Sequence, residues 1–177
     1  MSSACDFIAC DVCSNTMKDR QHDHSTSIPL DLEIFLCFAV YSAGHAFNRV
    51  YKPMLEKLRL TYPQYIAMVL LWERDGQTVG ELGRKLLLES NTLTPLLKRL
   101  ETLGNVKRQR DPLDERQVRV YLTDAGRKLR QRASHIPRCI LDATGLNVRQ
   151  AKQLFDQIGA LQKSLTSLSR SNLEHRP

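Results

Sequence analysis

The sequence lacks any long apolar run, and this absence excludes one class of protein at the outset. No stretch of about 18 uncharged apolar residues occurs among its 177 residues, so we expect no membrane span. The first residues also lack a basic start, and Asp6 and Asp11 interrupt their apolar residues, unlike a secretory signal peptide. We therefore expect a cytoplasmic protein, in which the five cysteines are reduced and need not form structural disulfides.

Acidic residues are in deficit. The chain has 19 acidic and 26 basic residues, a net charge of +7. An excess of positive charge favours a polyanionic partner, either nucleic acid or an anionic membrane, and the charge alone does not choose between them. Hydrophobic residues make up 42% of the chain, an ordinary globular value, and the length suits one domain or one domain with an appendage. The placement of the basic residues must therefore identify the partner.

Residues 1–29 are polar and show no sustained periodicity, so we predict a disordered tail. Three thiols and two imidazoles in this tail have spacings that resemble those of zinc or iron–sulfur ligands: Cys5, Cys10, Cys13, His22 and His24. Cysteines in such a segment are more often incidental than ligating, and we expect neither a metal nor another cofactor.

After residue 30, apolar residues begin to recur every three or four positions, the pattern of amphipathic helices. Pro53 should end the first helix near Tyr51, because proline is unfavourable inside a helix. Between Val106 and Leu122 the period falls to two, which indicates two short strands around a turn. The predicted helices cover about 31–51, 62–74, 78–87, 92–103, 124–142 and a stretch after Gly145, and the predicted strands are 106–110 and 117–122, joined by a turn at 111–114.

This order of elements predicts a mostly α fold with a small β-hairpin wing. By pattern, residues 62–122 form a winged helix-turn-helix inside a domain that covers 30–177. The last predicted helix carries apolar residues at near-heptad spacing, which favours packing against another helix, such as one from a second chain. We therefore expect 31–55 and 124–170 to hold N- and C-terminal dimerisation helices.

The predicted helix 92–103 buries a leucine face and, with the junction before it, presents polar residues to solvent. Small hydroxyls and an amide near the start of such a helix can reach base edges and phosphates, and the two basic residues can neutralise backbone charge. Taken alone, the same pattern also describes a plain solvated helix face. The residues that we expect to contact DNA are Ser90, Asn91, Thr92, Thr94, Lys98 and Arg99.

The hairpin concentrates five basic residues on and beside a tight turn: Lys107, Arg108, Arg110, Arg116 and Arg119. A thin ribbon tipped with arginine suits the minor groove, where negative potential is focused. We expect Arg110 and Arg116 to contact DNA, with Asp114 orienting Arg116 through a carboxylate–guanidinium pair. The alternative is a charged surface hairpin that prevents edge pairing. A helix-turn-helix followed by a basic hairpin favours double-stranded DNA as the partner.

Two motifs support a family resemblance: Asp114-Glu115-Arg116-Gln117-Val118 in the wing, and Leu122-Thr123-Asp124-Ala125-Gly126 after it. With them the chain resembles the MarR family of dimeric winged-helix regulators over about 31–168. It is most similar to the OhrR subgroup, the organic-hydroperoxide sensors. The segments that carry this second likeness are 36–41, 49–55, 60–65 and 92–98. The resemblance implies a homodimeric repressor that releases its DNA operator when an organic hydroperoxide oxidises a reactive cysteine.

By this resemblance, Cys37 is the peroxide-sensing cysteine, and Tyr41 and Tyr51 donate hydrogen bonds to its sulfur. A thiol attacks peroxide as the thiolate, which hydroxyl donors stabilise. Tyr41 lies four residues from Cys37 and shares its helix face. Tyr51 shares the face but lies too far along the same helix, so it must come from elsewhere in the assembly. The apolar neighbours of Cys37 suggest alkyl or lipid hydroperoxides as the signal. The alternative is that Cys37 is a small buried core residue.

The chain departs from many of its relatives at the position of the second, resolving cysteine, where it has Asp142. Cys139 lies three residues earlier, about one helical turn, and is one candidate for the resolver. A tail cysteine or a small-molecule thiol are the others.

Three other functions fit parts of the sequence. A MarR-type regulator can respond to a small phenolic ligand with Cys37 in a structural role. A thiol peroxidase would use Cys37 in catalysis, but the basic wing has no role in such an enzyme, so we expect no enzymatic activity. A membrane-surface protein is disfavoured, because the basic residues lie on a hairpin and a recognition-type helix and not along one amphipathic helix.

Overall fold

The computed structural model describes residues 32–174. The predicted tail 1–29, with its cysteines and histidines, lies outside the described residues. The chain divides into two compact units. One unit comprises residues 36–148, and the other comprises the residues before 36 together with those from 149 onward.

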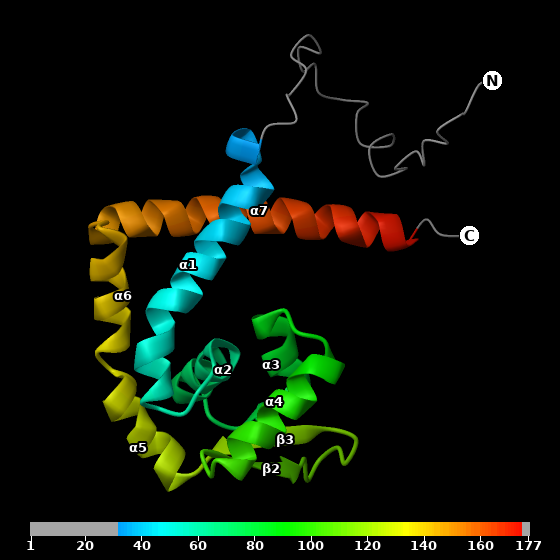
Figure 1. The fold of residues 1–177 in the computed structure, drawn as a ribbon. Helices are drawn as coiled ribbons and strands as arrows, with labels where there is room; N and C mark the ends of the chain where they lie inside the picture. Colours follow the sequence, from blue (N-terminus) through cyan, green and yellow to red (C-terminus); the bar gives the residue numbers. More distant parts are fainter. Residues whose placement is uncertain (1–31, 175–177) are drawn as a thin grey trace, which may run out of the picture. The chain divides into compact units, whose positions relative to one another are not determined.

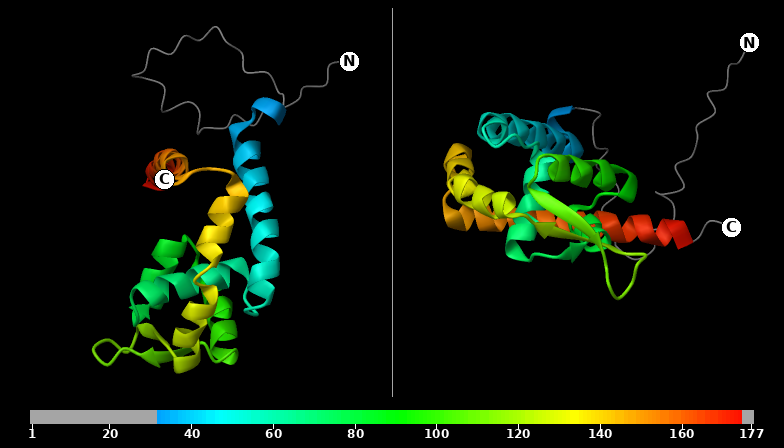
Figure 2. Two further views of the ribbon diagram at one scale, coloured as in Figure 1. Left: turned by 90° about the vertical axis from the view of Figure 1, so that its left-hand side faces the viewer. Right: turned by 90° about the horizontal axis from the view of Figure 1, so that it is seen from below.

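The 36–148 unit contains the helix-turn-helix and the hairpin (Figure 1). Its three strands form an antiparallel sheet in the order β1-β3-β2, in which Val106 pairs with Leu122 and Arg110 with Val118. The hairpin formed by β2 and β3 projects beyond α4 (Figure 2). The elements in chain order are α1 (Leu36–Glu56), α2 (Tyr62–Glu73), β1 (Gln77–Thr78), α3 (Val79–Leu86), α4 (Ser90–Thr102), β2 (Val106–Arg110), β3 (Val118–Leu122), α5 (Asp124–Ala133) and α6 (Ile136–Thr144).

The other unit holds a short 3-10 helix, Leu32–Ile34, and the long helix α7, Val148–Glu174. Several large apolar side chains of α7 are exposed to solvent: Leu154, Phe155, Ile158, Leu165 and Leu168. No helix among the described residues is both long enough and apolar enough to cross a membrane.

The core of the 36–148 unit lies where α2, α3 and α4 meet the sheet. The leucine face of α4 is buried, since Leu93, Leu97 and Leu100 are each at most 1% exposed. Val120 of β3 is also fully buried, and the Trp72 Nε1–H donates to the carbonyl of Gly126, which joins α2 to α5. Burying a leucine contributes about 1.5–3 kcal/mol, so this apolar face holds α4 in place.

The motif Leu122-Thr123-Asp124-Ala125-Gly126 has a structural cause. Thr123 caps α5 by accepting the backbone N–H of Gly126, and its own hydroxyl donates to the carbonyl of Gly104. A Cβ atom at Gly126 would overlap the carbonyl oxygen of Asn105. A glycine at this position therefore allows α5 to pack closely against the turn between α4 and β2.

The first helix does not end near Tyr51, as the sequence led us to expect, but continues through Pro53 to Glu56. Proline at position 53 removes one backbone hydrogen bond, the one to the carbonyl of Arg49. The turn that follows it carries Leu55, which is 2% exposed and belongs to the core. The tertiary burial of this last turn outweighs the missing hydrogen bond.

The single helix predicted over 124–142 is also wrong, because the structure has two helices, α5 and α6, that meet at Ser134 and His135. Pro137 lies in the first turn of α6, where an amide donor is not needed. Within one continuous helix, the same proline would leave the carbonyl of Ala133 without its donor. Strand β1 was not predicted either, because a strand of two residues is too short to show an alternating pattern.

Candidate functional site

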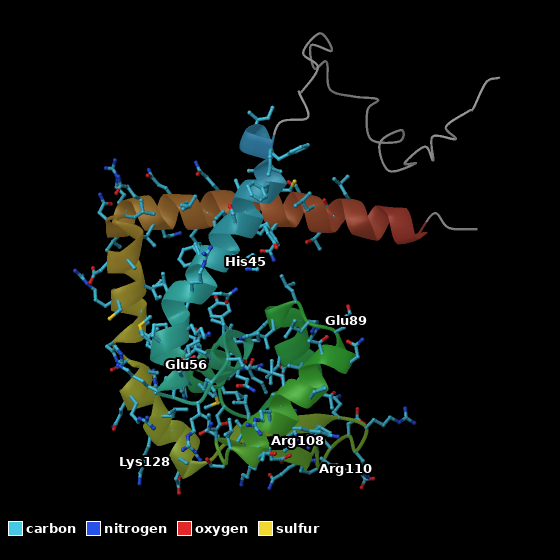
Figure 3. All side chains as sticks on the ribbon, in the orientation of Figure 1. His45, Glu56, Glu89, Arg108, Arg110 and Lys128 are labelled. Carbon is cyan, nitrogen blue, oxygen red and sulfur yellow. The ribbon has the colours of Figure 1, made fainter. Side chains whose placement is uncertain are left out.

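Helix α4 begins at Ser90, two residues before the predicted start, and Glu89 is its N-cap (Figure 3). The Glu89 carbonyl accepts the backbone N–H groups of Thr92 and Leu93 at 3.0 and 2.9 Å. Pro95 therefore lies beyond the first turn, and its missing N–H leaves the carbonyl of Asn91 without a helical donor. Of the six predicted DNA-contacting residues of this helix, Thr94 is half-buried and the others are exposed: Ser90, Asn91, Thr92, Lys98 and Arg99.

The turn of the wing is built by two aspartates that accept backbone N–H groups. The Asp111 carboxylate accepts the N–H of Leu113 at 2.9 Å, and the Asp114 carboxylate accepts the N–H of Arg116 at 3.1 Å. The other oxygen of Asp114 accepts the side-chain amide of Gln117 at 2.9 Å. The predicted ion pair between the side chains of Asp114 and Arg116 is therefore absent from the described part of the chain. Asp114 shapes the turn through the backbone.

The five basic residues of the hairpin fall into groups with different surroundings. Arg108 and Arg119 form ion pairs with carboxylates, Arg108 with Glu101 and Arg119 with Asp111. Lys107 is exposed, with its amine 5.9 Å from the ring centroid of Tyr121. Arg110 and Arg116 are exposed and form no ion pair within the described residues (Figure 3 labels Arg108 and Arg110). Of the four arginines in the hairpin, the two predicted to contact DNA are thus the ones without a carboxylate partner among the described residues.

The ion pairs that hold the stem of the hairpin lower the pKa values of their carboxyl groups. The pKa of Glu101 is lowered because Arg108 donates to it from both its side chain and its backbone. The pKa of Asp111 is lowered by the backbone N–H of Leu113 and then by the Arg119 guanidinium. Both carboxylates therefore stay ionised at neutral pH.

The turn between α2 and α3 contains a residue whose role the sequence did not reveal. One carboxylate oxygen of Asp75 accepts the backbone N–H groups of Gly76 and Leu122, at 2.9 and 2.8 Å. The other oxygen accepts the guanidinium of Arg127 at 2.8 Å. Asp75 therefore joins the helix-turn-helix to β3 and to α5. The sequence signalled only a turn here, because the partners lie about 50 residues away, at separations of 47 and 52 residues.

The start of α3 is capped as the sequence predicts. The Thr78 hydroxyl accepts the N–H of Glu81, and the Glu81 carboxylate accepts the N–H of Thr78. This bond and the nearby guanidinium of Arg74 lower the pKa of Glu81 to about 2. The preceding residue, Gln77, is 1% exposed, and its side-chain amide donates to the carbonyls of Leu70 and Arg74, which fixes the turn before α3.

The predicted sensing cysteine, Cys37, lies in the first turn of α1 and is a free, exposed thiol. It is therefore not a buried core residue of the single chain. Tyr41 follows one turn later on the same face, is 62% exposed, and contacts the ring of His45 edge-on at 4.4 Å. The apolar neighbours that we expected to line a pocket around the thiol are also exposed in the single chain: Leu36, Phe38 and Val40.

Tyr51 lies fourteen residues beyond Cys37 on α1, which corresponds to about 21 Å along the helix axis. The structure of one chain therefore does not bring these two residues together. Tyr51 instead packs against Tyr62 and Tyr65 of α2, with ring centroids at 4.7 and 5.9 Å. Burial, with a smaller contribution from the two neighbouring tyrosines, raises the pKa of Tyr51 to about 12, so its hydroxyl stays protonated.

Cys139 lies on α6 and is also a free, exposed thiol. Its neighbour Arg138 forms an ion pair at 3.0 Å with Asp142, the residue at the position of the resolving cysteine in the resembling family. A mostly apolar pocket of about 180 Å³ lies between α1 and α6. Its lining includes Ile140, the residue after Cys139, but does not include Cys37. The lining residues are Ala43, Ala46, Phe47, Val50, Ile140, Ala143 and Thr144. The described residues contain no group of three or more side chains placed to hold a metal ion.

The helix-turn-helix, the wing stem held by ion pairs and the two free wing arginines define a winged-helix DNA-binding protein that regulates transcription. Comparisons with known proteins support this class. The family profile described as transcriptional regulator SarA/Rot matches residues 49–133. Reduced AbfR bound to DNA has a similar structure, with a TM-score of 0.64 and 37% identity over 74% of this chain and 91% of that chain. AbfR, from Staphylococcus epidermidis, is similar in its disulfide form too, with a TM-score of 0.56, 38% identity, and coverage of 75% and 90%.

Curated relatives make the assignment more specific. The organic hydroperoxide resistance transcriptional regulator of Bacillus subtilis is 42% identical over 154 residues, which cover 87% of this chain and 99% of that protein. The HTH-type transcriptional regulator TtmR of Methylorubrum extorquens is 46% identical over 137 residues, which cover 77% and 70%. The chain belongs to the MarR family of winged-helix transcriptional regulators.

Proposed function

We propose that this regulator is a homodimeric repressor that releases its operator when an organic hydroperoxide oxidises Cys37. The observation that carries the proposal is the separation of the sensing residues within one chain. Cys37 and Tyr41 lie together at the start of α1, and Tyr51 lies about 21 Å further along the same helix. A second chain that packs antiparallel against α1 would place its Tyr51 beside Cys37.

Exposed apolar surface supports the homodimer. On α1, the side chains of Leu36, Phe38 and Val40 are 40–60% exposed, and α7 has the exposed apolar residues named above. Large apolar side chains that recur along a helix, as on α1 and on α7, are of the kind that interfaces between chains bury. A partner chain would also supply the apolar surroundings that the thiol lacks in the single chain.

The chemistry at Cys37 starts from the thiolate. Its sulfur attacks one peroxide oxygen, an S–O bond forms, the O–O bond breaks, and with one proton the products are a sulfenic acid and an alcohol. The protonated hydroxyl of Tyr51 is a donor suited to the thiolate. A second thiol then condenses with the sulfenic acid to give a disulfide and water, and Cys139, a tail cysteine or a small-molecule thiol can fill this role. The Bacillus subtilis relative, named for organic hydroperoxide resistance, supports this class of signal.

DNA reading in this proposal combines α4 and the wing. Ser90, Asn91 and Thr92 lie exposed at the start of α4, where recognition helices contact base edges, and Lys98 and Arg99 follow on its exposed surface. Arg110 and Arg116 enter the minor groove from the wing. Oxidation changes the packing of the dimer helices, which alters the spacing of the two reading heads, so that they no longer match two half-sites.

A gel-shift assay with the operator duplex, before and after treatment with cumene hydroperoxide, tests the proposal. The wild-type protein should release the duplex, Cys37→Ser should bind but not release it, and Cys139→Ser should still form the sulfenic acid. Hydrogen peroxide should act more slowly than cumene hydroperoxide. Continued release by Cys37→Ser would overturn the proposal, and catalytic turnover of peroxide with a reductant would indicate a thiol peroxidase.

The α1–α6 pocket favours a second candidate function, regulation by a small phenolic ligand with Cys37 structural. Its lining is mostly apolar and its volume of about 180 Å³ suits one aromatic ring. In that case, salicylate would release the duplex equally from wild-type protein and from Cys37→Ser.

A further inference from the structure

Arg119 connects two parts of the DNA-reading head that are far apart in sequence. It is the second residue of β3, opposite Gln109 of β2 and Thr78 of β1. Its Nε–H donates to the Asp111 carboxylate at 2.6 Å, and its Nη1–H donates to the carbonyl of Gly76 at 3.0 Å. Asp111 begins the wing turn, and Gly76 lies in the turn before α3. One guanidinium therefore joins the wing to the helix-turn-helix.

The surroundings of the ion pair between Arg119 and Asp111 strengthen it. The Asp111 side chain is 5% exposed and that of Arg119 is 35% exposed, so the carboxylate is shielded from water while the guanidinium is partly exposed. The second oxygen of Asp111 accepts the backbone N–H of Leu113 at 2.9 Å, so both carboxylate oxygens have donors. Hydrogen bonds between ionised groups are about twice as strong as neutral ones.

The wing needs such a contact because it is a thin hairpin held along one side. Arg108, which is bonded to Glu101 of α4, holds the near part of β2. Arg116 lies three residues beyond Arg119, a reach of at most about 10 Å of chain. A tilt of about 15° would displace the end of such an arm by up to about 2.6 Å, which is large against a minor groove about 6 Å wide.

We propose that Arg119 is a positioning residue for DNA reading: through Asp111 and the Gly76 carbonyl it fixes the angle between the wing and the helix-turn-helix. Arg110, at the end of β2, and Arg116, in the turn, then reach the minor groove while α4 occupies the major groove. The inference rests on the DNA-contacting role proposed above for the wing. It assigns Arg119 no contact with DNA, and this distinguishes it from a phosphate-binding arginine.

A double-mutant cycle tests this assignment with the full-length reduced protein and a duplex that the wild-type protein selects from a random library. Fluorescence anisotropy would measure the affinity of Arg119→Gln, Asp111→Asn and the double variant. Each single variant should bind about tenfold more weakly, and the double variant should be no weaker than either single one. Hydroxyl-radical footprinting should show loss of minor-groove protection with the α4 contacts retained. Arg119→Lys, which keeps the charge but reaches only one acceptor, should recover part of the affinity.

Two other outcomes would assign Arg119 a different role, and one variant serves as a control. If Arg119 binds a phosphate directly, Asp111→Asn should keep or raise the affinity while Arg119→Gln lowers it, which would overturn the inference. A loss of minor-groove and α4 protection together, in proportion to a lowered melting temperature, would show a merely structural role and would also overturn it. Arg138→Gln, which removes an arginine paired with Asp142 on α6, should bind as the wild type does.

Arg110→Gln and Arg116→Gln test the underlying role of the wing. If both bind the duplex as the wild type does, the wing does not read DNA, and the proposed DNA contacts fail together with this inference. If both lose affinity while Arg119→Gln does not, the wing contacts stand and only the positioning role of Arg119 is refuted.

Discussion

The Glu101 carboxylate of α4 accepts both the backbone N–H and the side-chain Nε–H of Arg108 in β2, at 3.0 and 2.8 Å. The Nη2 atom of the same guanidinium also lies 2.7 Å from the carboxylate. This relationship connects the end of the recognition helix to the first strand of the wing. It also explains why Arg108 is paired with a carboxylate, whereas Arg110, two residues later in the same basic hairpin, is exposed and has no such partner among the described residues.

Replacing Glu101 by Gln should destabilise the protein in a pH-dependent manner. The pKa of Glu101 is lowered in the folded protein, so its contribution is present above the unfolded pKa and is lost as the pH falls through the folded pKa. We expect a loss of about 0.5–1 kcal/mol at pH 7, kept small because the pair is partly exposed. Chemical denaturation from pH 7 to pH 3 would show the two proteins converging in acid. A constant difference over this range would contradict the expectation.

Mixed dimers should reveal whether Tyr51 acts on the thiol of the other chain. Tyr51→Phe alone should slow the oxidation of Cys37 by cumene hydroperoxide about tenfold, because a donor to the thiolate is lost. A heterodimer of a Tyr51→Phe chain with a Cys37→Ser chain contains one intact site if Tyr51 acts between chains. Stopped-flow kinetics of such mixtures should recover the wild-type rate for that site, whereas slow oxidation throughout would place Tyr51 elsewhere. Tyr121→Phe, in the wing, is the matched control and should oxidise normally.

Gly126→Ala should be strongly destabilising. Its Cβ would overlap the carbonyl oxygen of Asn105, and this neighbour is backbone that cannot rotate away. Overpacking of this kind costs about 1–3 kcal/mol. Gly80→Ala is a matched control, because the nearest atom to its Cβ is the Thr78 hydroxyl at 4.0 Å. Thermal unfolding should show a lowered melting temperature for Gly126→Ala alone, and equal behaviour of the two variants would contradict the close approach.

Much of the DNA-reading head could be predicted from the sequence, because its signals are local. The leucine spacing in α4 and the alternation in β2 and β3 appear in neighbouring residues, and the Thr78–Glu81 capping box spans only four. The predictions at Pro53 and over 124–142 were wrong. At Pro53 the burial of Leu55 outweighs a local cost, whereas over 124–142 Pro137 lies in the first turn of a new helix because it cannot donate a hydrogen bond inside a continuous one.

The sequence by itself determined that this chain is a winged-helix protein of net charge +7 with a basic hairpin, since composition and periodicity are properties of the chain alone. Only the tertiary structure decided what each charged side chain does. It engages Arg108 and Arg119 with carboxylates, leaves Arg110 and Arg116 exposed, and turns Asp114 toward the backbone. It likewise places Tyr51 among aromatic rings, far along α1 from Cys37. The reason is that an ion pair or a ring contact depends on which distant segments the fold brings within a few ångströms.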